Sequence, residues 1–465
     1  MAIGPLESAQ TSEPNTAELL AVRTRRRVTR RLLPFLIFAY LLAFIDRANL
    51  SVAKLAMQGD LHFTDQIIGF GAGIFFAGYF LLEIPGSLIV ERASARRWFA
   101  RIMITWGVVA ALTGLIGLAP LGGISTRHQF YLARFLLGAA EAGFFPGVIV
   151  YLSHWFRYED RTRAKAWFMV TQPLAIVIGT PTSRWILQNI HWAGLSGWRW
   201  VFLLEGAPSI VFGIVALFYL TDRVPQAHWL LEGEKEWLAN ELAREQAEKT
   251  AAGRVRIRDA FRQPQTLLLV LVFFLIVTSN QAILFFLPSI TEHFKRLSIT
   301  WRTGAATLPY VFSMAGILLN GFWSNRTGER RWHTAGPILI TSAALASAIL
   351  SGDHVGLAIA SLCLLGLTFQ AYLPPFWTLP TAFLGKSAAA VAIGTINSIG
   401  NLGGFVGPFV FGSLRTMTGS YEAGLWFLTG CMLASGLLAT QIRIPTSGPK
   451  SYIFNKSAPD TGREA

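Results

Sequence analysis

Residues 32–47 read LLPFLIFAYLLAFIDR, an uncharged apolar run followed by an aspartate and an arginine. An α-helix rises about 1.5 Å per residue, so the run from Leu32 to Ile45 spans about 21 Å. The hydrocarbon core of a bilayer is about 30 Å thick. The stretch therefore predicts a membrane-spanning helix that carries Asp46 and Arg47 deep into the lipid.

The composition of the whole chain agrees with a membrane protein. Of its 465 residues, 52% are hydrophobic and only 14% are charged, whereas soluble chains have roughly 25% charged residues. The 43 glycines suit the close packing of helices in lipid. A water-soluble protein is therefore excluded.

Twelve apolar stretches have the length that crosses a bilayer, about 20 residues each. They begin near Leu32, Ile67, Trp98, Gln129, Ala164, Arg199, Thr266, Trp301, Thr334, His354, Ala388 and Tyr421. We predict an all-α integral membrane protein with twelve transmembrane helices. Its domains are a basic tail over residues 1–31, a first half over 32–221, an amphipathic cytoplasmic linker over 222–264, a second half over 265–442 and a tail over 443–465.

The basic residues predict the orientation of the chain. Its formal net charge of +14 would favour nucleic-acid binding in a soluble protein. Here the Lys and Arg residues lie in the N-terminal tail and in alternate loops, as in the loops that contain Arg92 and Arg157. Cytoplasmic loops of membrane proteins carry this excess. We therefore expect both termini in the cytoplasm and no nucleic-acid partner.

A short motif occurs once in each half. RASARRW at residues 92–98 recurs as RTGERRW at residues 326–332, about half the chain length later. Each copy follows the second apolar stretch of its six. The motif therefore predicts an internal repeat, which is a common feature of transporter folds.

Ionised groups inside apolar stretches point to the functional site, because each costs at least about 2.5 kcal/mol at the middle of a bilayer. Asp46 and Arg47 are adjacent and diverge by about 100° around the helix, so we expect them to contact different neighbours. Arg134 and Glu141 are seven residues apart, on nearly the same face of the fourth span. These groups either hold helices together in fixed pairs or form a protonatable carboxylate beside a cationic anchor.

Further polar groups interrupt other spans. We expect Glu83 to have a structural role, binding the basic loop or a neighbouring backbone. Tyr79 fits either a packed aromatic ring or a hydroxyl donor to substrate. Gln172 and Asn397 fit hydrogen bonds between helices or the lining of a cavity.

The chain has none of the sequence patterns of an enzyme that we sought. It contains no metal-binding cluster, no phosphate-binding loop and no nucleophile elbow. Cys363 and Cys431, its only cysteines, lie in apolar stretches and fit a packing role. We expect no catalytic residue, no metal and no cofactor, which leaves a membrane-embedded enzyme or a sensor as the weaker alternatives.

Four motifs resemble the major facilitator superfamily, and within it the anion:cation symporters, which include tartrate, phthalate, hydroxyphenylacetate and sugar-acid permeases. The motifs are FIDRANLSVA at 44–53, RFLLGAAEAGFFPG at 134–147, GWRWVFLLEG at 197–206 and GERRWH at 328–333. The resemblance implies two six-helix halves around a central cavity. It also implies import of a small organic anion by alternating access with proton symport.

The same resemblance implies roles for the polar residues. Asp46 and Glu141 are expected to couple protons, and Arg47 to bind the substrate carboxylate. Tyr79, Gln172 and Asn397 are expected to hydrogen-bond the substrate. The residues expected to take part in coupling and gating are Arg134, Glu83, Arg92, Arg96, Arg326 and Arg330.

Several points are left open by the sequence. The substrate is a tartrate-like acid, a sugar acid or an aromatic acid, and an anion exchanger or a facilitator would use the same fold. We expect a monomer in a bacterial inner membrane, with protons, one organic anion and lipid as its partners.

Overall fold

The computed structural model describes residues 16–92, 94–118, 123–251, 264–292, 298–352, 354–383 and 386–443. The regular secondary structure of these residues is helical, which confirms the predicted all-α class. Nine helical segments in this part of the chain are long and apolar enough to cross a membrane. The other three predicted spans fall on α3, α6 and the pair α16–α17, whose bounds are given below.

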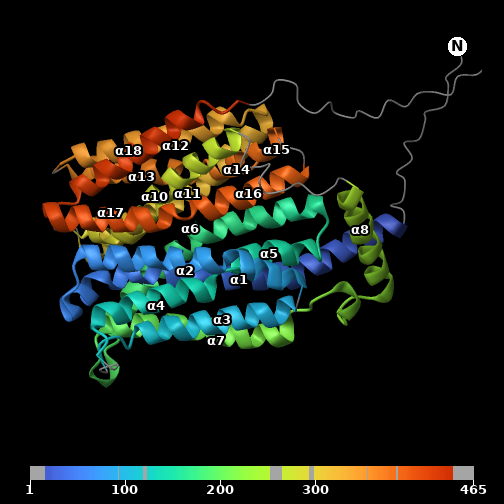
Figure 1. Ribbon diagram of the computed structural model, residues 1–465, viewed down its shortest axis with the longest axis horizontal. Coiled ribbons are helices and arrows are strands. Elements are labelled where there is room, and N and C mark those ends of the chain that lie inside the picture. The colour runs from blue at the N-terminus through green and yellow to red at the C-terminus, as the bar shows by residue number, and fades with distance from the viewer. Residues whose placement is uncertain are drawn as a thin grey trace, which may run out of the picture.

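The helices form two bundles. The first bundle contains α1 (Thr16–Leu61), α2 (Asp65–Arg92), α3 (Ala95–Thr113), α4 (Thr126–Glu141), α5 (Phe144–Ser153), α6 (Tyr158–Asn189) and α7 (Gly197–Tyr219). The second contains α10 (Pro264–Thr291), α11 (Ile299–Thr327), α12 (Arg331–Leu350), α13 (Val355–Phe369), α14 (Leu373–Phe376), α15 (Leu379–Phe383), α16 (Lys386–Gly400), α17 (Gly403–Thr418) and α18 (Glu422–Ala439). Figure 1 shows the first bundle, blue to green, beside the second, yellow to red.

Three predicted spans are interrupted rather than continuous. The fourth span is divided into α4 and α5 at Gly143, which has a φ of 82°. This left-handed backbone conformation is easily adopted by glycine, which has no Cβ. The tenth span breaks near Pro374, and the eleventh breaks at Asn401 between α16 and α17. Interruptions of this kind are tolerated in membranes when the surrounding protein satisfies the backbone.

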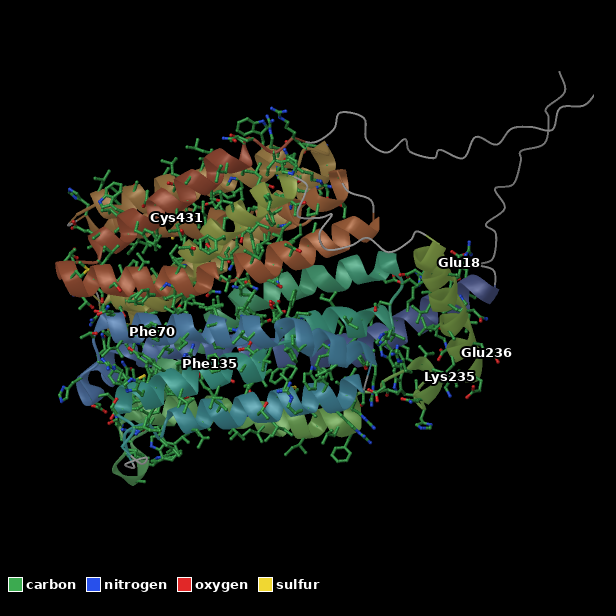
Figure 2. The ribbon with its side chains drawn as sticks, in the orientation of Figure 1. Glu18, Phe70, Phe135, Lys235, Glu236 and Cys431 are labelled. Carbon is green, nitrogen blue, oxygen red and sulfur yellow. The ribbon has the colours of Figure 1, made fainter. Side chains whose placement is uncertain are left out.

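The two bundles meet mainly through α2 and α17. A Cβ on Gly69 would lie 2.3 Å from the carbonyl oxygen of Pro408, so the backbones touch there. Phe70, labelled in Figure 2, contacts the rings of Phe405 and Phe409 at centroid distances of 5.8 and 5.7 Å. The helices of the eleventh span and of the second span thus pack closely at the junction of the bundles.

The linker helix α8 (Glu232–Ala251) docks on the first bundle. The fully buried Glu234 carboxylate accepts from Arg23 Nε at 2.9 Å and from Arg27 Nη1 at 2.6 Å, and both arginines lie on α1. Leu238 of α8 is buried. Figure 2 labels Lys235 and Glu236 on the same helix. A helix therefore occupies residues 232–251 of the predicted linker and packs on α1.

We predict that Gly138→Ala destabilises the first bundle. A Cβ at Gly138 would lie 1.9 Å from the carbonyl oxygen of Phe75, so α2 and α4 would have to separate. Overpacking of this kind costs about 1–3 kcal/mol. The loss should appear as a lower apparent melting temperature of the detergent-purified protein. Gly336→Ala is the matched control, because no atom lies within 4 Å of its added Cβ, and an unchanged melting temperature for Gly138→Ala would contradict the packing argument.

Candidate functional site

The candidate site is centred on an ion pair between the first and fourth predicted spans. Arg47 Nη2 of α1 lies 2.5 Å from Glu141 Oε1 at the end of α4, and the two side chains are 14% and 5% exposed. Loss of one partner would leave an uncompensated charge in the bundle, which is strongly unfavourable. Each group therefore depends on the other, or on a replacement of the same charge.

Aromatic rings surround the Arg47 guanidinium. Its Cζ lies 4.9, 5.2 and 5.3 Å from the ring centroids of Phe44, Phe75 and Tyr79. Such contacts attract a cation through the electron-rich faces of the rings. They hold the guanidinium in place without using its hydrogen-bond donors, which stay available to an anion.

Asp46 faces away from this pair, as the divergence of adjacent helical residues predicts. Its Oδ2 accepts from Trp106 Nε1 of α3 at 2.9 Å and from Ser209 Oγ of α7 at 3.0 Å. The side chain is 3% exposed, and its Oδ1 has no hydrogen-bond partner among the described residues. Asp46 therefore lies between α1, α3 and α7, not beside Arg47.

Arg134 connects the two carboxylates electrostatically. It is fully buried, and its Nε donates to the carbonyl oxygen of Gly71 at 3.3 Å. It lies close enough to Glu141, Arg47 and Asp46 to interact with their charges. Both terminal nitrogens lack a hydrogen-bond partner in the described part of the chain, so Arg134 still has donors for a carboxylate.

Glu83 requires a correction to the sequence analysis. We expected it to bind the basic loop or a neighbouring backbone, but its Oε1 accepts from Asn397 Nδ2 of α16 at 2.8 Å. Arg92 begins that loop nine residues further along α2, about 13 Å away along the helix axis. Glu83 instead faces the second bundle, whose Asn397 amide donates to one of its two carboxylate oxygens.

The remaining predicted substrate contacts lie nearby or are less defined. Tyr79 is 6% exposed, and its ring stacks on Phe75 at 6.1 Å. It lies one helical turn from Glu83 on α2, so the two share a face. Gln172 is half-buried on α6. The structure therefore groups Arg47, Tyr79 and Glu83 along neighbouring faces of α1 and α2.

The two basic loops are held within their own bundles. The backbone N of Arg96 donates to Asp222 Oδ1 at 2.8 Å. Arg330 Nη1 donates to Ser324 Oγ at 2.8 Å, and Arg326 Cζ lies 5.8 Å from the ring centroid of Trp323. The side chain of Arg92 lies outside the described residues. Gating by these arginines stays a prediction.

A second charged cluster joins the bundles at the end opposite the basic loops, which we call the outer end. Lys54 of α1 is fully buried, and its Nζ lies 2.5 Å from Asp65 Oδ1 of α2 and 4.0 Å from the Phe286 ring centroid of α10. Asp65 Oδ2 also lies 4.0 Å from Arg415 Nε of α17. The sequence analysis missed this cluster, although Lys54 lies seven residues after Arg47 on nearly the same helical face.

A further ion pair at the outer end joins the bundles through α6. Arg184 pairs with Glu292, and Arg302 Nη1 of α11 lies 2.6 Å from Glu292 Oε2. Arg184 Nη1 also donates to Thr303 Oγ1 at 2.7 Å. Ion pairs between the two bundles thus join them at this end.

We predict that Lys54→Met opens the outer end. Removing Lys54 leaves Asp65 with only the more distant Arg415, at 4.0 Å, as its cationic partner, so hydration of the junction becomes favourable. The reporter is the thiol of Ser289→Cys, a fully buried position on α10, in a background with Cys363→Ala and Cys431→Ala. Its labelling by a membrane-impermeant maleimide should accelerate about tenfold or more.

The double variant Lys54→Met with Asp65→Asn is the control for charge. It removes both members of the pair, so labelling should be slower than in Lys54→Met alone. Equal labelling rates in Lys54→Met and in the parent would show that the pair does not hold this end closed.

Paired charges kept inside a bundle of membrane-crossing helices are typical of a membrane transporter. Residues 36–408 match the Major Facilitator Superfamily. The chain belongs to this superfamily, and it is a multi-pass membrane secondary transporter rather than an enzyme. The superfamily expected from the sequence motifs is thereby confirmed.

Relatives match over nearly their whole length. A protein of Agrobacterium vitis named "Putative tartrate transporter" is 40% identical over 444 residues, which are 95% of this chain and 97% of that protein. The "Inner membrane transport protein RhmT" of Escherichia coli (strain K12) is 33% identical over 92% of this chain and 97% of its own. The solved structure of a D-xylose-proton symporter has a TM-score of 0.67 at 14% identity, over 90% of this chain and 98% of that chain.

Proposed function

We propose that this transporter imports an organic carboxylate together with protons by alternating access. The observation that carries the proposal is the pair of Arg47 Nη2 and Glu141 Oε1 at 2.5 Å, inside a ring of aromatic side chains. Arginine stays charged and binds carboxylates through two parallel hydrogen bonds. In the absence of substrate, Glu141 occupies the place of that carboxylate.

Protonation exchanges one anion for another in this site. A proton on Glu141 removes its negative charge and weakens its hold on Arg47. The freed guanidinium then binds the substrate carboxylate, and the net charge of the site is the same as before for a monoanion. This balance permits closure of the bundles, because no uncompensated charge is buried.

Asp46 takes part in this exchange through Arg134. Arg134 interacts with both Asp46 and Glu141. When Asp46 is protonated, Glu141 is the carboxylate that still attracts the Arg134 guanidinium. That attraction competes with Arg47 for the same carboxylate. Both carboxyl groups thus influence Arg47, Glu141 directly and Asp46 through Arg134.

The substrate class follows from the groups around Arg47. Tyr79 and the Glu83–Asn397 pair offer hydrogen bonds to hydroxyl groups, which suits a tartrate-like acid or a sugar acid. Phe44 and Phe75 also suit an aromatic acid. The relative named for tartrate makes tartrate the first substrate to test.

The finer architecture is part of the same proposal. We place twelve transmembrane helices in two six-helix halves, at residues 32–221 and 265–442, around a central cavity. Residues 222–264 and both tails lie in the cytoplasm. The named inner-membrane relative supports a bacterial inner membrane as the location.

The test is uptake of labelled tartrate and of a panel of sugar and aromatic acids into proteoliposomes. A proton gradient directed inward, with the lower pH outside, should drive accumulation of the acid, and a protonophore should abolish it. Protein-free liposomes are the control for uptake that does not depend on the protein. The membrane potential adds about 2.3 kcal/mol per charge per 100 mV for any net charge moved. Accumulation that is indifferent to the pH gradient but needs an internal counter-anion would establish an exchanger and refute symport, and equilibration without accumulation would establish a facilitator.

A further inference from the structure

A further buried carboxyl group in the first bundle has no place in the mechanism above. Glu205 of α7 is 7% exposed, and its Oε1 accepts from Ser183 Oγ of α6 at 2.6 Å. Its Oε2 has no hydrogen-bond partner in the described part of the chain. Among these residues Glu205 forms no ion pair, whereas Glu141 does.

No cation pairs with the Glu205 carboxyl group in the described part of the chain, and a second carboxyl group acts on it. Burying an ionised carboxylate without a cation is costly, and the group takes up a proton instead. The charged group that acts on Glu205 is Asp46 of α1, which is itself negative when ionised. The neighbouring α6 contributes the Ser183 hydroxyl, and α3 contributes the Trp106 indole beside Asp46. Negative charges on Glu205 and on Asp46 would repel each other, so we do not expect both groups to be ionised at once.

The geometry along α7 orders these groups from the outer end inward. Ser209, which donates to Asp46, lies four residues after Glu205, on the same face and about 6 Å further along the axis. Glu205 lies eight residues, or about 12 Å, inside Gly197 at the start of α7. Ser183, the partner of Glu205, precedes Arg184, which pairs with Glu292 at the outer end.

We propose that Glu205 is a proton-relay residue that supplies Asp46 from the outer end. The inference rests on the proposed proton symport and adds a route to it. The proton of Glu205 moves onto Ser209 Oγ, directly or through one water, while the Ser209 hydroxyl proton moves onto Asp46 Oδ2. Glu205 then regains a proton from the Ser183 hydroxyl, while Ser183 takes up a proton from water at the outer end. One proton has moved inward and no bond between heavy atoms has changed.

Hydroxyl groups suit this task because each both donates and accepts a hydrogen bond. The route also runs apart from Arg47, whose partners are Glu141 and the surrounding rings. Proton entry and substrate binding thus use different faces of α1. A change on one face can therefore be measured without altering the other.

The experiment compares two activities of Glu205→Gln in proteoliposomes, with tartrate as the probe. The initial rate of uptake driven by a pH gradient should fall about 100-fold, because the relay has lost its proton carrier. Tartrate counterflow at equal pH on both sides should stay close to that of the parent, because it requires no net proton movement. Glutamine keeps the shape and the acceptor for Ser183, so a structural role would spare both activities. Glu232→Gln, whose side chain is 81% exposed on α8, is the matched control.

Two results would overturn the relay. One is a Glu205→Gln variant that accumulates tartrate like the parent. The other is an equal loss of accumulation and counterflow, which would mark damage to substrate exchange or to the fold rather than to proton supply. Glu205→Asp is the second variant, because it retains an ionisable group and should restore part of the accumulation. A parent protein that shows counterflow but ignores the pH gradient would instead refute the proposed symport, and the relay with it.

Discussion

Replacing Arg47 by glutamine will nearly abolish transport. Glutamine cannot balance the charge of a bound carboxylate, and it leaves Glu141 without the partner that lies 2.5 Å away. Truncating one member of a buried charge pair costs about 3 kcal/mol or more, which is roughly a 100-fold loss of kcat/KM. Initial rates of tartrate uptake in proteoliposomes measure the effect.

Two further variants show whether the loss reflects recognition of the anion. Arg47→Lys keeps the charge but cannot bind a carboxylate through two parallel hydrogen bonds, so an intermediate rate is expected. Arg97→Gln removes an exposed arginine from the first basic loop and should leave the rate close to that of the parent. Uptake by Arg47→Gln at the parental rate would remove Arg47 from the substrate site.

Asp46→Asn is expected to abolish accumulation against a gradient. The asparagine oxygen accepts the same two hydrogen bonds, from Trp106 and Ser209, that Asp46 Oδ2 accepts. Packing is therefore preserved, while the capacity to take up a proton is lost. A pH gradient of one unit stores about 1.4 kcal/mol per proton and supports about a tenfold concentration ratio. In the variant the internal tartrate concentration should only reach the external one.

The chain offers a closely matched control for this variant. Asp60, near the outer end of α1, also accepts hydrogen bonds from a tryptophan and a serine, Trp198 Nε1 at 2.7 Å and Ser196 Oγ. Asp60→Asn should therefore leave accumulation intact. Parental accumulation by Asp46→Asn would show that Asp46 carries no coupling proton.

The pattern of the sequence was sufficient for the fold class and for several contacts. Each of the twelve apolar stretches falls on one helix or on two or three shorter helices in succession, because a bilayer leaves a polar backbone few other solutions. The angle between adjacent helical residues also predicted that Asp46 and Arg47 have different neighbours. Local periodicity determines both features, and it can be counted along the chain.

Partners that depend on where distant helices meet could not be predicted in the same way. Glu83 was expected near the basic loop, yet it binds Asn397 of the other bundle. Lys54 and Asp65 were overlooked because they are neither close in sequence nor part of a motif. Glu205 lies inside a quoted motif, but only its burial without a cation distinguishes it.

The amino-acid order alone determined that the chain crosses lipid many times and that the buried Asp46, Arg47 and Glu141 need partners. The physical reason is that burial of charge and of backbone in hydrocarbon is costly wherever it occurs along a chain. Tertiary packing decided the pairs themselves: Arg47 with Glu141, Glu83 with Asn397, and the buried lysine at the outer end with Asp65. Those pairs arise from helices brought together by distant small residues and rings, and such contacts have no fixed spacing in sequence.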